Sequence, residues 1–188
     1  MPDQILVEYC APTMAGIKTA SLFRLHFDDE RKVREDIDEM DRKLYGKGIR
    51  VIPMRFDSQY VLLYVYRPML LRKDLRHPVV SRTLTELGYT MDGDEQKMVA
   101  QLAERIQTNQ EFPHEIGFFL GYPVEDVVGF MYHRDDGCKK VGYWKVYGNL
   151  EKASELFDQY TRCICVYRQS LAHGRSILDL TVNMPCYS

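Results

Sequence analysis

The stretch IRVIPMRFDSQYVLLYVYR, residues 49–67, decides the fold class of this chain. Residues 49–56 and 60–66 are rich in β-branched and aromatic side chains, and a short polar link separates them. This pattern predicts an antiparallel β-hairpin. The second run is apolar at nearly every position, which indicates a strand that is covered on both faces. Pro53 cannot donate a ladder hydrogen bond, so the first run is predicted to be an edge strand or to carry a bulge.

Helices are predicted on both sides of this hairpin. Before it, residues 28–48 are highly charged but carry one apolar stripe at steps of four, three and four, made of Val33, Ile37, Met40 and Leu44. After it, residues 68–89 are predicted to be helical with an interruption at Pro78, because proline starts or kinks a helix. Further helices are predicted over 92–107, over two short segments introduced by Pro113 and Pro123, and over 149–174.

Three other segments complete the predicted fold. Residues 4–9 indicate a strand, and a helix is predicted to start near Pro12 and to continue over residues 15–25, with Gly16 as a weak point. Residues 142–147 indicate a strand in the same sheet as the hairpin, and the tail 176–183 a last strand. Strands and helices do not alternate strictly, so the sequence predicts an α+β fold in which a small, mainly antiparallel sheet (hairpin 49–66 plus strand 142–147) packs with several helices. We expect residues 1–188 to form a single domain.

Composition and charge exclude some classes of function. The 188 residues include 25 Lys and Arg against 27 Asp and Glu, for a formal net charge of −2. This balance lacks the positive excess that drives nucleic-acid binding, so we expect no nucleic-acid partner. No apolar stretch approaches the roughly 20 residues of a membrane span, and the first residues do not resemble a secretory signal. We therefore expect no membrane association and a cytoplasmic location, where the five cysteines would be reduced thiols.

The segment CAPTMAGIKTASLF, residues 10–23, is the first candidate for chemistry. If a helix starts near Pro12, the Cys10 thiol lies at the positive end of the helix dipole, which favours the thiolate. Lys18 would add positive potential if the chain folds it back. The free N–H groups of that first turn could instead hold an anion or an oxyanion. The alternative is that Cys10 packs in the core, as cysteines often do.

The segment FPHEIGFFLGYPVEDVVGF, residues 112–130, is the second candidate. Its glycines lie among large apolar residues, so helices or a ligand can approach the backbone closely there. His114 follows a proline near a predicted helix start, where the dipole keeps the imidazole neutral and available as a base or ligand. A capping or packing role is the alternative for His114. Glu125 and Asp126 fall in a first helical turn, which indicates simple complementation of the dipole.

Metal and cofactor signals are weak in this sequence. Cys163 and Cys165 are two residues apart on a predicted helix, on different sides, so they are poor joint ligands and no metal site is expected. No nucleotide-binding or zinc-protease motif occurs, and no cofactor can be specified. Several aromatic residues could line a pocket for a planar ligand or belong to the core, namely Tyr64, Tyr66, Tyr143, Trp144 and Tyr147.

The segments CAPTMAGIK, PHEIGFFLGYPVEDVVGF and VGYWKVYG resemble the signature segments of a bacterial domain family of unknown function found in anaerobes. The resemblance covers nearly the full chain, from about Cys10 to the long final helix. It implies a cytosolic, single-domain protein without an assigned activity. Relatives are encoded near flavodoxin-like or iron-uptake genes, which implies a link to redox or metal physiology through gene neighbours.

These observations predict one small-molecule or acyl-substrate site between the Cys10 turn and the His114 segment. Cys10 and His114 are the candidate catalytic residues of a thiol-dependent enzyme. The candidate ligand-binding residues are Thr13, Gly16, Lys18, Glu115, Gly117, Gly121 and Tyr122. The alternative is a non-catalytic ligand-binding or protein-interaction module linked to redox or iron physiology, and the sequence leaves open whether the chain is an enzyme.

Overall fold

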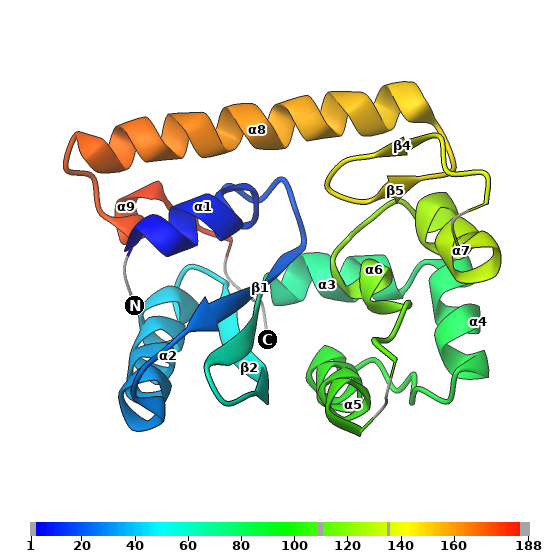
Figure 1. Cartoon of the computed structure of the whole chain (residues 1–188), viewed down its shortest axis with the longest axis horizontal. Coiled ribbons are helices and arrows are strands. Elements are labelled where there is room, and N and C mark those ends of the chain that lie inside the picture. Colours follow the sequence, from blue (N-terminus) through cyan, green and yellow to red (C-terminus); the bar gives the residue numbers. More distant parts are fainter. Residues whose placement is uncertain (1–2, 109–110, 135, 185–188) are drawn as a thin grey trace.

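A computed structural model describes residues 3–108, 111–134 and 136–184 of the chain (Figure 1). Along this part of the chain the elements are α1 (Asp3–Met14), β1 (Ala20–His26), α2 (Glu30–Tyr45), β2 (Arg50–Phe56), β3 (Tyr60–Tyr66), α3 (Pro68–Leu75), α4 (Pro78–Glu86), α5 (Glu95–Thr108), α6 (Ile116–Phe119), α7 (Val124–His133), β4 (Lys140–Val141), β5 (Lys145–Val146), α8 (Leu150–Ala172) and α9 (Ile177–Leu180). The chain is an α+β protein, as predicted. Within these ranges no helix is both long enough and apolar enough to cross a membrane.

The predicted hairpin forms the centre of the main sheet. Strands β2 and β3 pair antiparallel, and the register shifts between Pro53 and Arg55, which confirms the edge strand with a bulge. The strand order is β1-β3-β2, so β3 has a neighbour along each edge. Nearly every residue of β3 is buried, because helices cover both faces of this strand.

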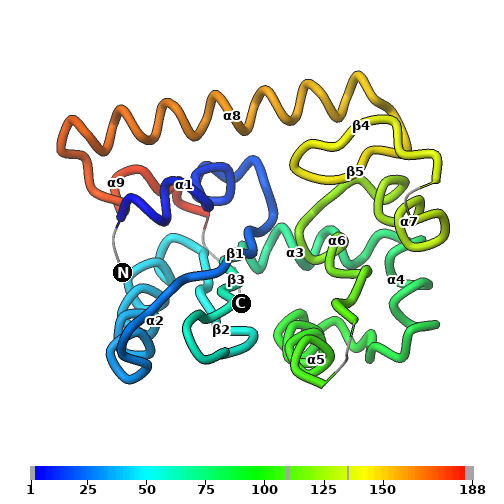
Figure 2. Tube along the Cα trace, viewed as in Figure 1, coloured from blue at the N-terminus to red at the C-terminus, as the bar shows by residue number. Residues whose placement is uncertain are grey.

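Alternation along β3 sends its side chains into two separate cores. Figure 2 shows the strands with α2 on one side and α5 on the other. Val61, Leu63 and Val65 pack with residues of α1 and α2 on one face of the sheet. Leu62, Tyr64 and Tyr66 pack with residues of α3, α5 and α6 on the other face. The sheet therefore lies between two helical layers.

The long helix α8 connects two parts of the molecule. Figure 1 shows it running above both α1 and the β4–β5 hairpin. Its first half forms a third small core with that hairpin, in which Trp144, Val146, Ala153, Phe157 and Tyr160 are buried. Its second half packs against α1. The predicted helices between residues 28 and 174 are confirmed, including the break before Pro78 and the Asn149 side chain that caps α8.

The predictions for the first 26 residues are wrong. Residues 4–9 belong to helix α1 rather than to a strand, and Pro12 lies in the last turn of this helix rather than at a helix start. Leu6, Cys10 and Met14 recur at steps of four and are fully buried, which is the helical pattern. The segment after Gly16 then forms strand β1, because the apolar strand β3 needs a partner along its second edge.

Two predicted strands near the C-terminus are also wrong. Residues 142–147 do not join the main sheet, since β5 pairs with β4 in a separate two-stranded hairpin. Residues 177–180 form a helical turn, α9, in which the Ser176 hydroxyl and the Asp179 carboxylate make a reciprocal capping box. The spacing Ser-x-x-Asp, with the apolar pair Ile177 and Leu178 between its two polar residues, was the local signal for this turn.

Candidate functional site

A pocket of about 220 Å³ lies where α1, β1, α8 and the β4–β5 turn meet. We call it the tyrosine pocket, and its lining residues are Glu8, Tyr9, Pro12, Lys18, Ser21, Leu22, Tyr122, Tyr143, Tyr160 and Ile164. The pocket joins segments that are more than a hundred residues apart in the sequence. It therefore exists only because α8 and the loop before α7 fold back onto the α1–β1 connection.

Lys18 is the one basic side chain in the lining of this pocket. Its Nζ atom lies 5.5 Å from the centre of the Tyr122 ring and 5.9 Å from the centre of the Tyr160 ring. Among the described residues it has neither an ion pair nor a hydrogen-bond partner. Desolvation lowers the pKa of Lys18 to about 8, and the neighbouring Cys10 opposes this effect only in part.

Two tyrosines of the pocket, Tyr122 and Tyr160, keep their protons near neutral pH. Burial raises the pKa of Tyr122 and of Tyr160 to about 12. In the portions of the chain that the structure describes, neither hydroxyl group hydrogen-bonds to another residue. Tyr143, by contrast, has its hydroxyl 3.3 Å from Thr161 Oγ1. The pocket thus offers the Lys18 amine and the hydroxyl groups of Tyr122 and Tyr160 among aromatic walls.

The end of α1 holds Lys18 in place. The backbone N–H groups of Ile17 and Lys18 both donate to the carbonyl of Pro12, and Gly16 turns the chain with a φ of +74°. The buried guanidinium of Arg67 donates to the carbonyls of Thr13 and Met14, each at 2.6 Å. A cation at a helix C-terminus complements the helix dipole, so Arg67 stabilises the turn that presents Lys18.

Thr13 and Gly16 therefore have structural contacts in this fold. Thr13 Oγ1 lies 3.0 Å from Ser21 Oγ, a buried contact that joins α1 to β1. A Cβ atom at Gly16 would lie 3.0 Å from the Met184 side chain. Neither residue lines the tyrosine pocket, although both support the connection that carries Lys18.

Two glycines position Tyr122. Gly121 has a φ of +70°, and a Cβ atom there would lie 2.5 Å from Thr19 Oγ1, which donates to Asp74 Oδ2 at 2.5 Å. At Gly117 a Cβ atom would lie 2.7 Å from the Val127 side chain. The prediction that other groups approach the backbone closely at these glycines is confirmed. The approaching groups are side chains of the protein itself, Thr19 and Val127.

Cys10 does not have the setting that the sequence predicted. It lies inside α1 rather than ahead of a helix start, and none of its surface is exposed. Burial raises the pKa of the Cys10 thiol to about 12, while Lys18 and the Ser21 hydroxyl act in the opposite direction more weakly. The prediction of a thiolate favoured by a helix N-terminus is therefore wrong in its premise.

His114 lies at a second, larger cavity of about 370 Å³, which we call the His114 cavity. Its lining is almost entirely apolar and aromatic, and comprises Phe112, Pro113, His114, Ile116, Gly117, Tyr122, Asp126, Val127, Phe130, Trp144 and Lys145. The His114 ring packs edge-on against Phe130, with ring centres 5.0 Å apart. Its Nε2 atom is buried and has no hydrogen-bond partner within the described ranges.

The structure separates the two residues proposed as a catalytic pair. Cys10 belongs to the core between the sheet and the α1–α2 layer, whereas His114 lines a cavity beside α6 and α7. Glu115 points to neither pocket, since its carboxylate accepts from the Tyr89 hydroxyl at 3.0 Å and pairs with Arg105. Of the expected ligand-binding residues, Lys18 and Tyr122 meet in the tyrosine pocket, and Gly117 and Tyr122 line the His114 cavity together with His114.

Asp126 has a structural role that sequence patterns did not reveal. Trp144 Nε1 donates to its carboxylate at 2.7 Å, and so do the backbone N–H groups of Tyr147 and Gly148, also at 2.7 Å. Asp126 thereby holds the β4–β5 hairpin on α7. It also fixes Trp144, which stacks on Tyr122 with ring centres 4.9 Å apart. Tyr122 lines both the tyrosine pocket and the His114 cavity, whereas Trp144 lines only the His114 cavity of these two.

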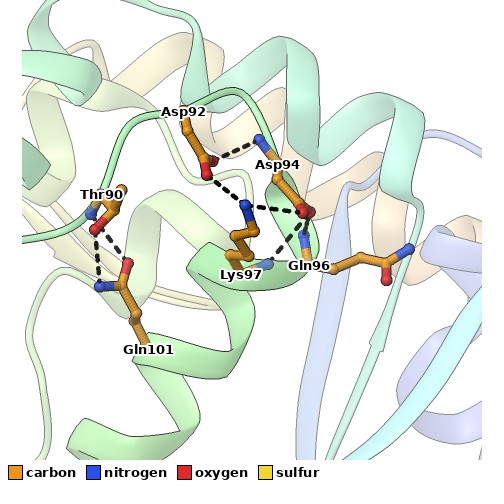
Figure 3. Close-up of polar contacts among 6 residues, drawn as sticks. All are labelled: Thr90, Asp92, Asp94, Gln96, Lys97 and Gln101. Carbon is orange, nitrogen blue, oxygen red and sulfur yellow. Dashed lines mark hydrogen bonds and ion pairs between the residues drawn. The ribbon is translucent and has the colours of Figure 1, made fainter.

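An exposed polar cluster, separate from both pockets, lies at the start of α5 (Figure 3). Asp94 accepts from the backbone N–H groups of Gln96 and Lys97, and Lys97 Nζ pairs with Asp92 at 2.7 Å. These contacts cap the helix, and each charge in them has a partner. The described residues hold no group of three His, Cys, Asp or Glu side chains that could bind a metal ion.

The fold and the tyrosine pocket define an α+β protein with one unpaired amine in an aromatic site. A family model described as Protein of unknown function (DUF3793) matches residues 6–181. The chain belongs to this family, which confirms the resemblance to a domain family of unknown function. The comparisons with curated proteins and with solved structures gave no match.

Proposed function

We propose that this protein binds a small molecule in the tyrosine pocket, with Lys18 pairing with an oxygen acceptor of the ligand. The observation that carries the proposal is the Lys18 amine, which is partly buried and has no counter-ion among the described residues. Removing a charge from water without a partner is unfavourable. A ligand carboxylate or carbonyl oxygen would supply that partner.

The other groups of the pocket indicate the class of ligand. The rings of Tyr122 and Tyr160 favour a flat, unsaturated body that can stack, and their free hydroxyl groups can donate to further oxygen atoms. The volume of about 220 Å³ lies below the roughly 300–1,000 Å³ that is usual for drug-sized ligands. The proposed ligand is therefore a small aromatic or unsaturated acid or carbonyl compound.

This proposal keeps the region expected from the sequence but changes the residues. The site still lies between the segment that follows Cys10 and the segment that follows His114. Thiol-dependent catalysis by Cys10 with His114 has less support, because the Cys10 thiol is fully buried and its pKa is raised. Lys18, rather than Cys10, is therefore the main residue of the proposed site.

The single tryptophan of the chain provides the test. Trp144 lines the His114 cavity and stacks on Tyr122, which lines the tyrosine pocket, so its fluorescence should respond when a ligand contacts Tyr122. The dependence on Lys18 then distinguishes a ligand in the tyrosine pocket from one in the His114 cavity. Benzoate, 4-methylbenzoate and phenyl phosphate are titrated at millimolar concentration into the wild type, Lys18→Met and Lys97→Met. We expect a saturable change that Lys18→Met weakens at least tenfold. Lys97 is exposed and paired with Asp92, so its replacement is the matched control.

Equal responses in the wild type and Lys18→Met would contradict the proposal. The absence of any saturable response across the three probes would also contradict the proposed ligand class.

A further inference from the structure

The tyrosine pocket contains an amine that can act as a nucleophile. Lys18 Nζ is within 6 Å of the centres of two tyrosine rings and has no carboxylate bound to it in the described ranges. The ionisable groups around it are Glu8, Tyr9 and Cys10 from α1, Tyr122 from the loop before α7, Tyr143 from the β4–β5 turn and Tyr160 from α8. The Glu8 carboxylate is bound by the Arg168 guanidinium, so it does not neutralise Lys18.

The protonation states favour the amine over the thiol. With a pKa of about 8, roughly a quarter of Lys18 is uncharged at pH 7.5, against about one in a thousand for an ordinary exposed lysine. A desolvated lysine in an apolar pocket is a known type of activated nucleophile. The Cys10 thiol has a pKa of about 12 and no exposed surface, so it stays protonated and inaccessible.

We infer that Lys18 forms an imine with a small aldehyde or ketone bound in the tyrosine pocket. This inference rests on the proposed ligand site and names the carbonyl compounds as its substrate class. It also assigns the reactive position of the site to an amine that the sequence suggested only as a source of positive potential.

The bond changes balance without an oxidant or a reductant. The lone pair of the neutral Nζ atom attacks the carbonyl carbon, an N–C bond forms, and the C=O π bond breaks. Proton transfer from nitrogen to oxygen gives a carbinolamine. Loss of that oxygen as water, with the remaining N–H proton, leaves the C=N bond. Tyr122 and Tyr160 remain protonated at neutral pH and can donate hydrogen bonds to the carbonyl oxygen as negative charge develops on it.

Other lysines differ from Lys18 in their surroundings. Lys43 pairs with Glu39 and Lys97 pairs with Asp92, and these carboxylates raise the pKa of each amine. Both side chains are exposed and remain almost fully protonated near neutral pH. Lys18 should therefore react selectively.

The test is reductive trapping of the imine with 4-formylbenzoate and cyanoborohydride, followed by peptide mapping by mass spectrometry. We expect the adduct on Lys18 to form at least tenfold faster than on Lys43 or Lys97. The rate at Lys18 should rise with pH around a midpoint near 8. Lys18→Met should remove this fast adduct, whereas Lys97→Met should leave it unchanged. Labelling of Lys18 at the rate of the exposed lysines would overturn the inference.

A non-reactive analogue separates this inference from the proposed function. 4-Methylbenzoate has the same ring and carboxylate but no carbonyl group on the ring. If it binds in a Lys18-dependent manner while 4-formylbenzoate gives no fast adduct, the ligand site stands and the imine is wrong. If neither compound binds or reacts at Lys18, both proposals fail.

Discussion

Lys18 and Asp126 both adjoin the Tyr122–Trp144 stack, Lys18 at the Tyr122 ring and Asp126 at the Trp144 indole, but they differ in their hydrogen-bond partners. Asp126 is buried and accepts three hydrogen bonds of 2.7 Å, from one side chain and two backbone groups. Lys18 is desolvated enough to lower its pKa to about 8, yet among the described residues it contacts only aromatic rings and has neither a carboxylate nor a hydrogen-bond acceptor. Burying a charge costs little when its hydrogen-bonding capacity is satisfied, whereas an unsatisfied buried charge destabilises the fold. The presence of hydrogen-bond partners marks Asp126 as a structural residue, and their absence leaves Lys18 available to a ligand.

The largest expected effect is at Asp126. Asp126→Ala leaves the Trp144 indole and two backbone N–H groups without an acceptor, so we expect the free energy of unfolding to fall by about 3–5 kcal/mol. Urea unfolding followed by circular dichroism measures this change. Glu125→Ala, on the exposed neighbour in the same turn, is the control and should change stability by less than about 1 kcal/mol. Similar losses for both variants would contradict the structural role of Asp126.

Gly121→Ala tests the close contact between Thr19 and the turn that precedes Tyr122. An alanine at a φ of +70° is strained by about 1 kcal/mol, and its Cβ atom would also displace Thr19 from Asp74. We expect a total loss of about 2–3 kcal/mol in the same urea experiment. Gly174 has a φ of +84° with open space around it, so Gly174→Ala should show the conformational part alone. Equal losses at the two positions would show that the contact with Thr19 does not matter.

A smaller effect of opposite sign is expected at Lys18. The folded pKa of about 8 is below the ordinary value near 10.4, so between these values the unfolded chain binds more protons and stability rises with pH. Below pH 8 the charged amine destabilises the fold. Lys18→Met should therefore raise the free energy of unfolding by about 1–2 kcal/mol at pH 7, a value discounted for the partly exposed side chain.

The pH profile provides the control for this variant. From about pH 8.5 upward the buried Cys10 lowers the stability of both proteins, because its raised pKa makes the folded state hold a proton that the unfolded thiol loses. The Lys18 effect is therefore the difference between the two profiles, and the wild type should gain stability relative to Lys18→Met between pH 8 and 9. A difference that stays constant over this range would contradict the lowered pKa of Lys18.

Local patterns predicted the parts of the fold that local forces determine. The hairpin, the bulge at Pro53 and the Asn149 cap each depend on residues close together in the sequence. The first 26 residues failed because short apolar runs suit a helix and a strand equally well. The position of β1 depends on the open edge of β3, some 40 residues later.

The candidate site was only partly predictable for a similar reason. Lys18 and Tyr122 were expected to bind a ligand, but their proximity arises from tertiary packing. Tyr9 and Tyr160 were missed, because an aromatic residue on a helix gives no signal that distinguishes a pocket wall from a core position. Asp126 was assigned to the helix dipole, since its true partners follow about twenty residues later.

The most direct test of the central claim is the titration of Lys18 itself. Reductive ¹³C-methylation of the lysines followed by NMR gives a separate pH curve for each amine, and the Lys18→Met variant assigns the resonance. Lys97 is the internal reference, because Asp92 raises its pKa above the ordinary value. We predict that Lys18 titrates with a pKa of about 8 and that a bound carboxylate raises this pKa. A Lys18 pKa at or above the ordinary value near 10.4 would contradict the claim that this amine is unpaired and desolvated.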